Sequence, residues 1–153
     1  KNIIMVYWFT GQPAHGKTVL ANMLKKHLEA NKVFPYKVMR IDGDDMRELF
    51  SNKDYSIKGR VENVGTAQRI SHYLHNQGLD VIVSLVAPYV DQRNDFKELM
   101  GSAMTEIYVH TSEPRERDHF KAIAYNPPTD NYIDIDTTTD TPQQSLDKLL
   151  IQL

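Results

Sequence analysis

The sequence has 153 residues, of which 41% are apolar and 25% charged, a composition that indicates one globular domain rather than a disordered chain. Its 18 basic and 20 acidic side chains give a net charge of -2, so no overall field attracts nucleic acid or an anionic membrane. Cysteine is absent, which excludes disulfides and zinc–cysteine sites, and no apolar run can span a bilayer, so we expect a cytoplasmic protein.

Short apolar runs alternate with amphipathic segments along the chain. The first and third runs are nearly uninterrupted, which is typical of strands buried on both faces. We expect residues 137–142, TTTDTP, to cap the last helix, with Pro142 in its first turn. The alternation predicts an α/β fold with a central, mostly parallel sheet of about five strands and helices on both faces. The expected strands are residues 3–10, 36–41, 79–86, 104–110 and 132–136, and the expected helices are residues 17–31, 45–51, 60–77, 92–100, 114–121 and 142–153.

The stretch GQPAHGKT joins the first expected strand to the first expected helix. It matches G-x-x-x-x-G-K-[ST] at every fixed position, and this context of strand, loop and helix makes the match a strong one. Backbone N–H groups of such a loop bind phosphate oxygens, Lys17 reaches the β- and γ-phosphates, and the Thr18 hydroxyl ligates Mg²⁺. The sequence therefore predicts a P-loop NTPase-like fold that binds ATP and Mg²⁺. The expected phosphate-binding residues are Gly11, Gln12, Pro13, Ala14, His15, Gly16, Lys17 and Thr18.

Two positions in this loop are unusual. Pro13 has no backbone N–H, so one donor to the phosphates is missing. His15 could donate a hydrogen bond to a phosphate, but we favour an exposed loop histidine without a role. The chain has no N-K-x-D motif, which argues against a switch GTPase, and the third strand ends in Ser84 where a Walker B aspartate is expected.

An acidic turn follows the second expected strand in RIDGDDMRELF. It contains Asp42, Asp44 and Asp45, and the carboxyl ends of parallel strands form the ligand crevice, so these side chains are expected to face the P-loop. An aspartate there can accept a proton from an attacking hydroxyl or bind Mg²⁺ through water. We predict this role for Asp44, with Asp42 as the second catalytic candidate beside Lys17. One of the three aspartates is also expected to cap a helix that begins near Met46.

Three arginines are expected near the same crevice. Arg47 follows the acidic turn, Arg60 begins the long helix, and Arg93 comes after the third strand. Guanidinium groups bind phosphate or sulfate in a bidentate manner, and a chain with a net charge of -2 needs local cations for an anionic acceptor. The three positions therefore predict an anion-binding pocket for the acceptor.

Four motifs in register, WFTGQPAHGKTVLA, RIDGDDMR, YSIKGRVENV and VIVSLVAPYVDQRND, resemble adenylylsulfate kinases over residues 3–118. Members of that family use MgATP to phosphorylate the ribose 3′-hydroxyl of adenosine 5′-phosphosulfate (APS). The resemblance implies that the P-loop binds the ATP phosphates, that Arg117 also contacts ATP, and that the metal is held by Thr18 and Asp44. It further implies an acceptor site that contains Asp42, Asp44, Arg47, Tyr55, Arg60, Asn63, Ser84, Leu85 and Tyr89. Because in-line transfer needs no phosphoserine, we interpret Ser84 as a pocket residue and not as a nucleophile.

The chain departs from the family pattern at three places. Gly59 stands before Arg60 where the family has aspartate, and Val90 replaces an arginine. A short lid at about residues 119–131 replaces a longer one within the single domain, which is expected to change acceptor preference or permit hydrolysis. Two alternatives stay open: another nucleotide acceptor such as cytidine diphosphoramidate, and an ATP-binding module without catalysis. The family is often dimeric, so the resemblance also suggests a homodimer.

Overall fold

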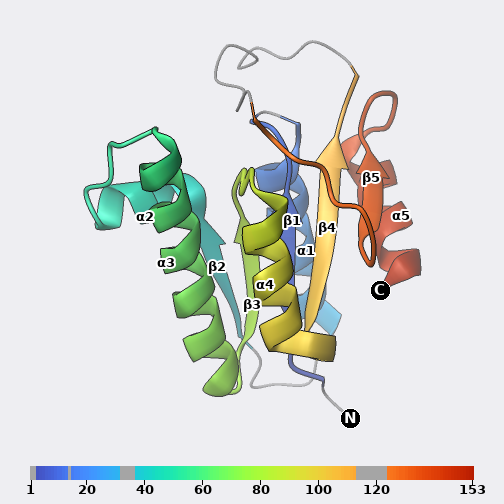
Figure 1. Cartoon of the computed structure of the whole chain (residues 1–153). Coiled ribbons are helices and arrows are strands. Elements are labelled where there is room, and N and C mark those ends of the chain that lie inside the picture. The colour runs from blue at the N-terminus through green and yellow to red at the C-terminus, as the bar shows by residue number, and fades with distance from the viewer. Residues whose placement is uncertain (1–2, 14, 32–36, 113–123) are drawn as a thin grey trace.

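A central sheet of five parallel strands organises the computed structural model, which describes residues 3–13, 15–31, 37–112 and 124–153. The strand order is β2-β3-β1-β4-β5, and each neighbouring pair is parallel (Figure 1). The predicted α/β fold with a parallel sheet is therefore confirmed. The strands are β1 (Val6–Thr10), β2 (Val38–Asp42), β3 (Asp80–Ser84), β4 (Met104–His110) and β5 (Ile133–Asp136).

Helices cover both faces of this sheet (Figure 1). One face packs against α1 (Lys17–Asn31) and α5 (Pro142–Gln152), and the other packs against α2 (Gly43–Leu49), α3 (Ile57–Asn76) and α4 (Val90–Met100). A 3₁₀ turn, η1 (Gly101–Ala103), leads from α4 into β4. The helix predicted at residues 114–121 lies outside the described residues. Within the described ranges, no helix is long and apolar enough to cross a membrane.

The burial of β1 explains why its sequence is apolar without interruption. Tyr7 and Phe9 point into the core beneath α1 and α5, whereas Val6 and Trp8 point into the core beneath α3 and α4. The Trp8 ring packs against the Phe96 ring of α4 with 5.4 Å between centroids. Both faces of the strand are thus removed from water, and its polar side chain, that of Thr10 at the end, donates to the Val86 carbonyl at 2.8 Å.

Helix caps set boundaries that differ from the predicted ones. α2 begins at Gly43 because Asp42 caps it, with Oδ1 accepting a hydrogen bond from the Asp44 backbone N–H at 2.9 Å. α3 begins three residues before Arg60, at Ile57, with Ser56 as its cap. The predicted cap of the last helix is confirmed, because Thr141 and Gln144 form a capping box with Pro142 in the first turn.

Residues 124–132, which we name the strap, pass over β4 on the same side of the sheet as α4 (Figure 1). The Tyr125 hydroxyl lies 2.9 Å from Thr10 Oγ1 at the end of β1, and the Asn126 N–H donates to the Pro88 carbonyl at 2.7 Å. The described part of the predicted lid is therefore bonded to the body of the domain. Residues 119–123 of that segment lie outside the described ranges.

Candidate functional site

The P-loop lies between the carboxyl end of β1 and the first turn of α1, at the centre of the sheet. Gly11 has φ 148° and Gly16 has φ 103°, both in the region that favours glycine. A side chain at Gly11 would also collide with the Val109 carbonyl oxygen of β4. The two glycines of the motif are thus required by backbone conformation, and the first N–H groups of α1, which have no partner within the helix, follow directly after them.

Lys17 is buried, with 7% of its surface exposed, although it is the first residue of a helix. Its Nζ donates to the Gln12 carbonyl oxygen at 2.8 Å, so the ammonium group crosses the loop. Gln12 and Pro13 are half-buried in the same loop. The expected ATP contacts Ala14 and Arg117 lie outside the described residues.

The expectation of an exposed His15 is wrong, because the residue is 5% exposed. Its carbonyl oxygen accepts a hydrogen bond from Thr137 Oγ1 at 3.0 Å, and the same hydroxyl lies 3.1 Å from the His110 carbonyl at the end of β4. The connection between β5 and α5 thus passes beside the P-loop and covers it. This neighbour comes from a segment 122 residues away in the chain, which no local pattern can predict.

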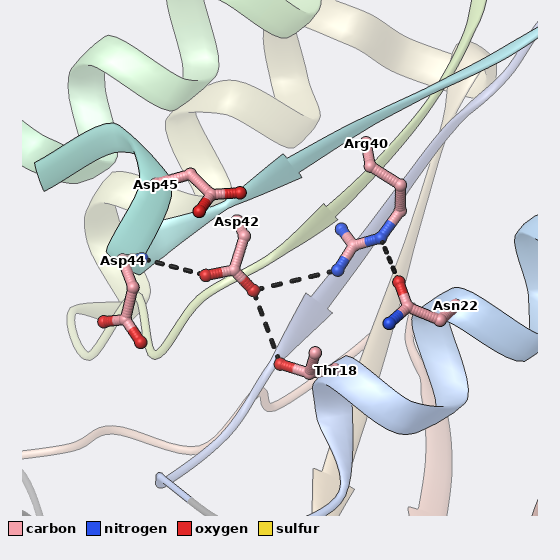
Figure 2. A pocket seen from close by; sticks show the side chains of 6 residues that line it. All are labelled: Thr18, Asn22, Arg40, Asp42, Asp44 and Asp45. Atoms are coloured by element: carbon pink, nitrogen blue, oxygen red, sulfur yellow. Dashed lines mark hydrogen bonds and ion pairs between the residues drawn. The ribbon is translucent and has the colours of Figure 1, made fainter. Parts of the chain in front are cut away.

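An open pocket of about 540 Å³ lies between the start of α1 and the carboxyl end of β2 (Figure 2). One oxygen of its lining, Oδ2 of Asp42, is approached by three polar groups. Thr18 Oγ1 donates to it at 3.4 Å, Ser84 Oγ donates to it at 3.2 Å, and Arg40 Nη2 lies 3.7 Å away. The pocket is lined by Thr18, Asn22, Arg40, Asp42, Asp44 and Asp45.

The donor set of this pocket fits a magnesium ion. The Thr18 hydroxyl and the Asp42 carboxylate are hard oxygen ligands, and Mg²⁺ in such sites usually takes one or two protein oxygens together with phosphates and water. Asp44, the residue predicted to bind the metal with Thr18, is exposed in the first turn of α2 and lines the same pocket. Among the described residues, it is Asp42 that contacts Thr18. Within the described ranges, no three acidic or histidine side chains are arranged so that they could hold a metal ion by themselves.

Sequence reasoning missed Arg40. Burial lowers the pKa of its guanidinium, and the nearby carboxylates of Asp42 and Asp45 oppose that shift. The signal was present in VMRID, since the period of two along a strand places Val38, Arg40 and Asp42 on one face. An arginine on an edge strand is usually a solvated charge, and only the packing of α1 against this face shows otherwise.

Three of the expected acceptor residues, Asn63, Ser84 and Leu85, lie beside this pocket, and the fourth, Tyr89, follows β3 in the chain. Asn63 of α3 is buried, and its Nδ2 donates to the Gly43 carbonyl at 3.4 Å. Leu85 is buried against Gly43, where an added Cβ would lie 2.7 Å from the Leu85 Cβ. Ser84 ends β3 with its hydroxyl on Asp42, and Tyr89 follows as the half-buried N-cap of α4. The start of α2, the end of β3 and Asn63 of α3 therefore form one wall beside the Asp42 carboxylate.

Arg47 and Tyr55 form a stacked pair at the outer end of the site. The Arg47 guanidinium lies 3.9 Å from the centroid of the Tyr55 ring, and Tyr55 remains 63% exposed. Arg47 Nη1 donates to the backbone and side-chain oxygens of Asn52, and so it also holds the loop between α2 and α3. Arg60 lies half-buried in the first turn of α3, and its side chain makes no hydrogen bond or ion pair with another described residue.

The expectation that Arg93 binds an anion in the crevice is wrong. Its side chain is 1% exposed, and Nε donates to Glu106 Oε2 at 2.8 Å. The remaining donors bond the carbonyl oxygens of Ala87 at 2.6 Å and Asn126 at 2.5 Å. Because α4 packs on β4, this arginine faces the sheet and not the solvent. Its guanidinium instead joins β4, the end of β3 and the strap.

The family model of adenylylsulphate kinase matches residues 4–144 of the chain. An adenylyl-sulfate kinase of Clostridium acetobutylicum is 26% identical over 144 residues, which cover 91% of this chain and 70% of that protein. A cytidine diphosphoramidate kinase of Campylobacter jejuni is 26% identical over 151 residues, which cover 95% of this chain and 86% of that protein. Other curated relatives are longer, and the chain spans about half of their length or less.

A solved structure of the APS kinase CysC of Mycobacterium tuberculosis, in complex with AMPPNP and APS, superposes on the whole chain. The TM-score is 0.79 at 18% sequence identity, with 99% of both chains covered. At this identity the likeness establishes the fold. The P-loop kinase architecture predicted from the sequence is therefore confirmed.

Proposed function

Because this chain belongs to the adenylylsulphate kinase family, we propose that it transfers the γ-phosphate of ATP to the ribose 3′-hydroxyl of a nucleotide, with APS as the first acceptor to test. The observation that carries the proposal is the contact between the P-loop hydroxyl of Thr18 and the Asp42 carboxylate at 3.4 Å. A phosphate-binding loop and a metal-binding carboxylate at the same edge of a parallel sheet are the two parts that phosphoryl transfer requires.

The P-loop residues would hold the phosphates of ATP. The N-terminal N–H groups of α1 would donate to the phosphate oxygens, and the ammonium group of Lys17 would exchange the Gln12 carbonyl for the β- and γ-phosphates. Thr18 and Asp42 would hold Mg²⁺, which neutralises negative charge on the phosphoryl group when it is bound. The chain thus offers both a cation and a candidate metal site beside the P-loop.

The contacts of Asp42 and Asp44 support different roles for the two residues. Asp42 is bonded to Thr18 and Ser84, and this favours it for the metal, where the sequence favoured Asp44. Asp44 is exposed in the pocket, and its carboxylate is the better candidate to accept the proton of the acceptor hydroxyl. The hydroxyl oxygen would bond to the γ-phosphorus as the bond from that phosphorus to the leaving oxygen of ADP breaks.

The acceptor would lie against the wall formed by Asn63, Ser84 and Leu85, with its base near Tyr55 and with Tyr89 as a further contact. Tyr55 has one face stacked on Arg47 and most of its surface exposed, which suits base stacking on the open face. Arg60 has no bonded partner among the described residues, so it suits the acceptor anion. These assignments remain proposals that depend on the acceptor.

A second acceptor, cytidine diphosphoramidate, is a specific alternative. The relative named for that activity matches 95% of this chain, against 91% for the Clostridium acetobutylicum enzyme, and both are 26% identical to it. Val90 and the shortened lid distinguish this chain from the APS kinase pattern on the acceptor side. The chemistry at Lys17, Thr18 and the aspartates is the same for both acceptors.

A panel of acceptors with γ-labelled ATP tests the proposal. APS, cytidine diphosphoramidate and unmodified nucleotides are each incubated with MgATP, and label transfer is followed against a Lys17→Ala control. We expect transfer to one nucleotide class and none in the control. Transfer to a sugar acid but to no nucleotide would contradict the proposal, and ATP binding without transfer to any acceptor would favour a binding module.

A further inference from the structure

Among the described residues, Arg40 is the one cation that lines the pocket beside the P-loop, together with three carboxylates (Figure 2). It projects from β2 toward the start of α1, and its Nε donates to Asn22 Oδ1 at 2.9 Å. Nη1 donates to the carbonyl oxygens of Ile41 at 3.1 Å and Ile82 at 3.0 Å. Nη2 donates to Ser84 Oγ at 2.9 Å. The guanidinium group therefore connects α1, β2 and β3 at the carboxyl edge of the sheet.

The donor count shows that Arg40 is not a receptor for a free anion. A guanidinium group has five N–H donors, and four of them are used by these contacts. One N–H of Nη2 remains on the side of Asp42, whose Oδ2 is 3.7 Å from that nitrogen. A phosphate oxygen could bind Arg40 only through this last N–H, beside the Asp42 carboxylate, or by displacing an existing bond.

The bonds run in one direction toward Asp42. Arg40 donates to Ser84 Oγ at 2.9 Å, and the Ser84 hydroxyl in turn donates to Asp42 Oδ2 at 3.2 Å. The other oxygen, Oδ1, accepts from the Asp44 N–H at the start of α2. Both oxygens of the carboxylate are thus held by donors from different elements, and its rotation is restricted. A carboxylate with a fixed orientation suits Mg²⁺, which tolerates little departure from octahedral geometry.

We propose that Arg40 is a positioning residue that orients the Asp42 carboxylate for the metal, directly and through Ser84. The inference rests on the proposed function only insofar as that function assigns Mg²⁺ to Thr18 and Asp42. This role requires the planar guanidinium group of arginine, because its three nitrogens donate hydrogen bonds in three different directions. A lysine ammonium at the same place keeps the charge but cannot reach Asn22, Ser84 and the two carbonyls together.

The inference can be tested without an acceptor, by measuring how much Mg²⁺ strengthens the binding of ADP. The dissociation constant of ADP is measured with Mg²⁺ and again in EDTA, and the ratio of the two is the gain from the metal. Arg40→Met and Arg40→Lys are compared with the wild type, and Arg69→Met is the matched control, because Arg69 is an exposed arginine of α3 that bonds only Thr66. Asn22→Ala, which removes a single partner of Arg40, provides a milder variant.

We expect both Arg40 variants to reduce the gain by about 10-fold or more, with ADP binding in EDTA changed by less than about two-fold. Asn22→Ala should reduce the gain less, and Arg69→Met should leave it unchanged. An Arg40→Lys variant with the wild-type gain would overturn the inference, because charge alone would then suffice. Equal weakening of ADP binding with and without metal would also overturn it, because the role would then be general stability. If Arg40→Met does not fold, Arg40→Lys and Asn22→Ala decide the question.

The two proposals fail in different ways. A wild type that gains affinity from Mg²⁺ but phosphorylates no nucleotide would refute the proposed function and leave the role of Arg40 standing. A wild type that binds ADP equally well with and without Mg²⁺ would overturn the inference about Arg40, whatever the acceptor panel shows.

Discussion

Replacement of Arg93 by methionine should destabilise the domain and leave acceptor binding intact in the molecules that remain folded. The side chain is 1% exposed, so its charge and three hydrogen bonds lie in the interior. The variant keeps the 2.8 Å ion pair between Lys97 and Glu106, which prevents a fully isolated buried carboxylate. It removes the more deeply buried partner of Glu106 and leaves the carbonyls of Ala87 and Asn126 without this donor.

These lost contacts determine how far the free energy of unfolding should fall. Each unsatisfied buried carbonyl costs about 1 kcal/mol or more, and breaking a buried ion pair costs about 3–5 kcal/mol when nothing replaces the partner. Because Lys97 remains, we expect a loss of about 3 kcal/mol in the free energy of unfolding. At about 2–4 °C per kcal/mol for a chain of this size, the Tm should fall by roughly 6–12 °C.

Urea unfolding and thermal unfolding measure this loss, with Arg69→Met as the exposed control. The control should change the free energy of unfolding by less than about 0.5 kcal/mol. Arg93→Met should unfold at a lower urea concentration and a lower temperature than the wild type, with an unchanged KM for the acceptor. If the variant were as stable as the wild type and instead had a raised acceptor KM, Arg93 would be an anion-binding residue and the reasoning from its burial would be refuted.

Three further predictions concern the P-loop, the acceptor pocket and the core. Gly11→Ala should abolish MgATP binding measured by calorimetry, because a Cβ collides with the Val109 carbonyl and φ is 148°; retained affinity would contradict the requirement for glycine. Arg60→Ala should raise the acceptor KM far more than the KM for ATP in steady-state assays, and equal effects on both would remove Arg60 from the acceptor site. Burial and the nearby Asp80 raise the pKa of Tyr7 to about 12. Since an unfolded tyrosine ionises near pH 10, this contribution to stability should be complete below about pH 10 and decline as the pH rises toward 12. The Tyr7 phenolate, followed as the absorbance difference between the wild type and Tyr7→Phe, should appear only on unfolding, and its ionisation in the folded state near pH 10 would contradict this.

Local patterns were sufficient for the architecture and for the phosphate-binding loop. The uninterrupted apolar run of β1 predicted a strand buried on both faces, and the structure buries Val6, Trp8, Tyr7 and Phe9 in the two cores. The residues of GQPAHGKT predicted the loop because glycine conformation and helix N-terminal donors are properties of adjacent residues. The first residues of the helices were predicted less accurately, since a helix cap depends on a single side chain. Such a side chain can bond at several places, as that of Asp42 does.

By itself the sequence determined the order of the elements, the place of the P-loop and the acidic group at the end of the second strand. Only the tertiary structure decided what each charged side chain does. Arg93 follows a strand at the expected edge, yet packing of α4 on β4 turns it inward to Glu106. Arg40 carries no motif, yet the meeting of α1, β2 and β3 surrounds it with bonded partners. The physical reason is that burial and hydrogen bonding of a charge depend on residues far away in the chain, whereas backbone preference and hydrophobic period depend on near neighbours.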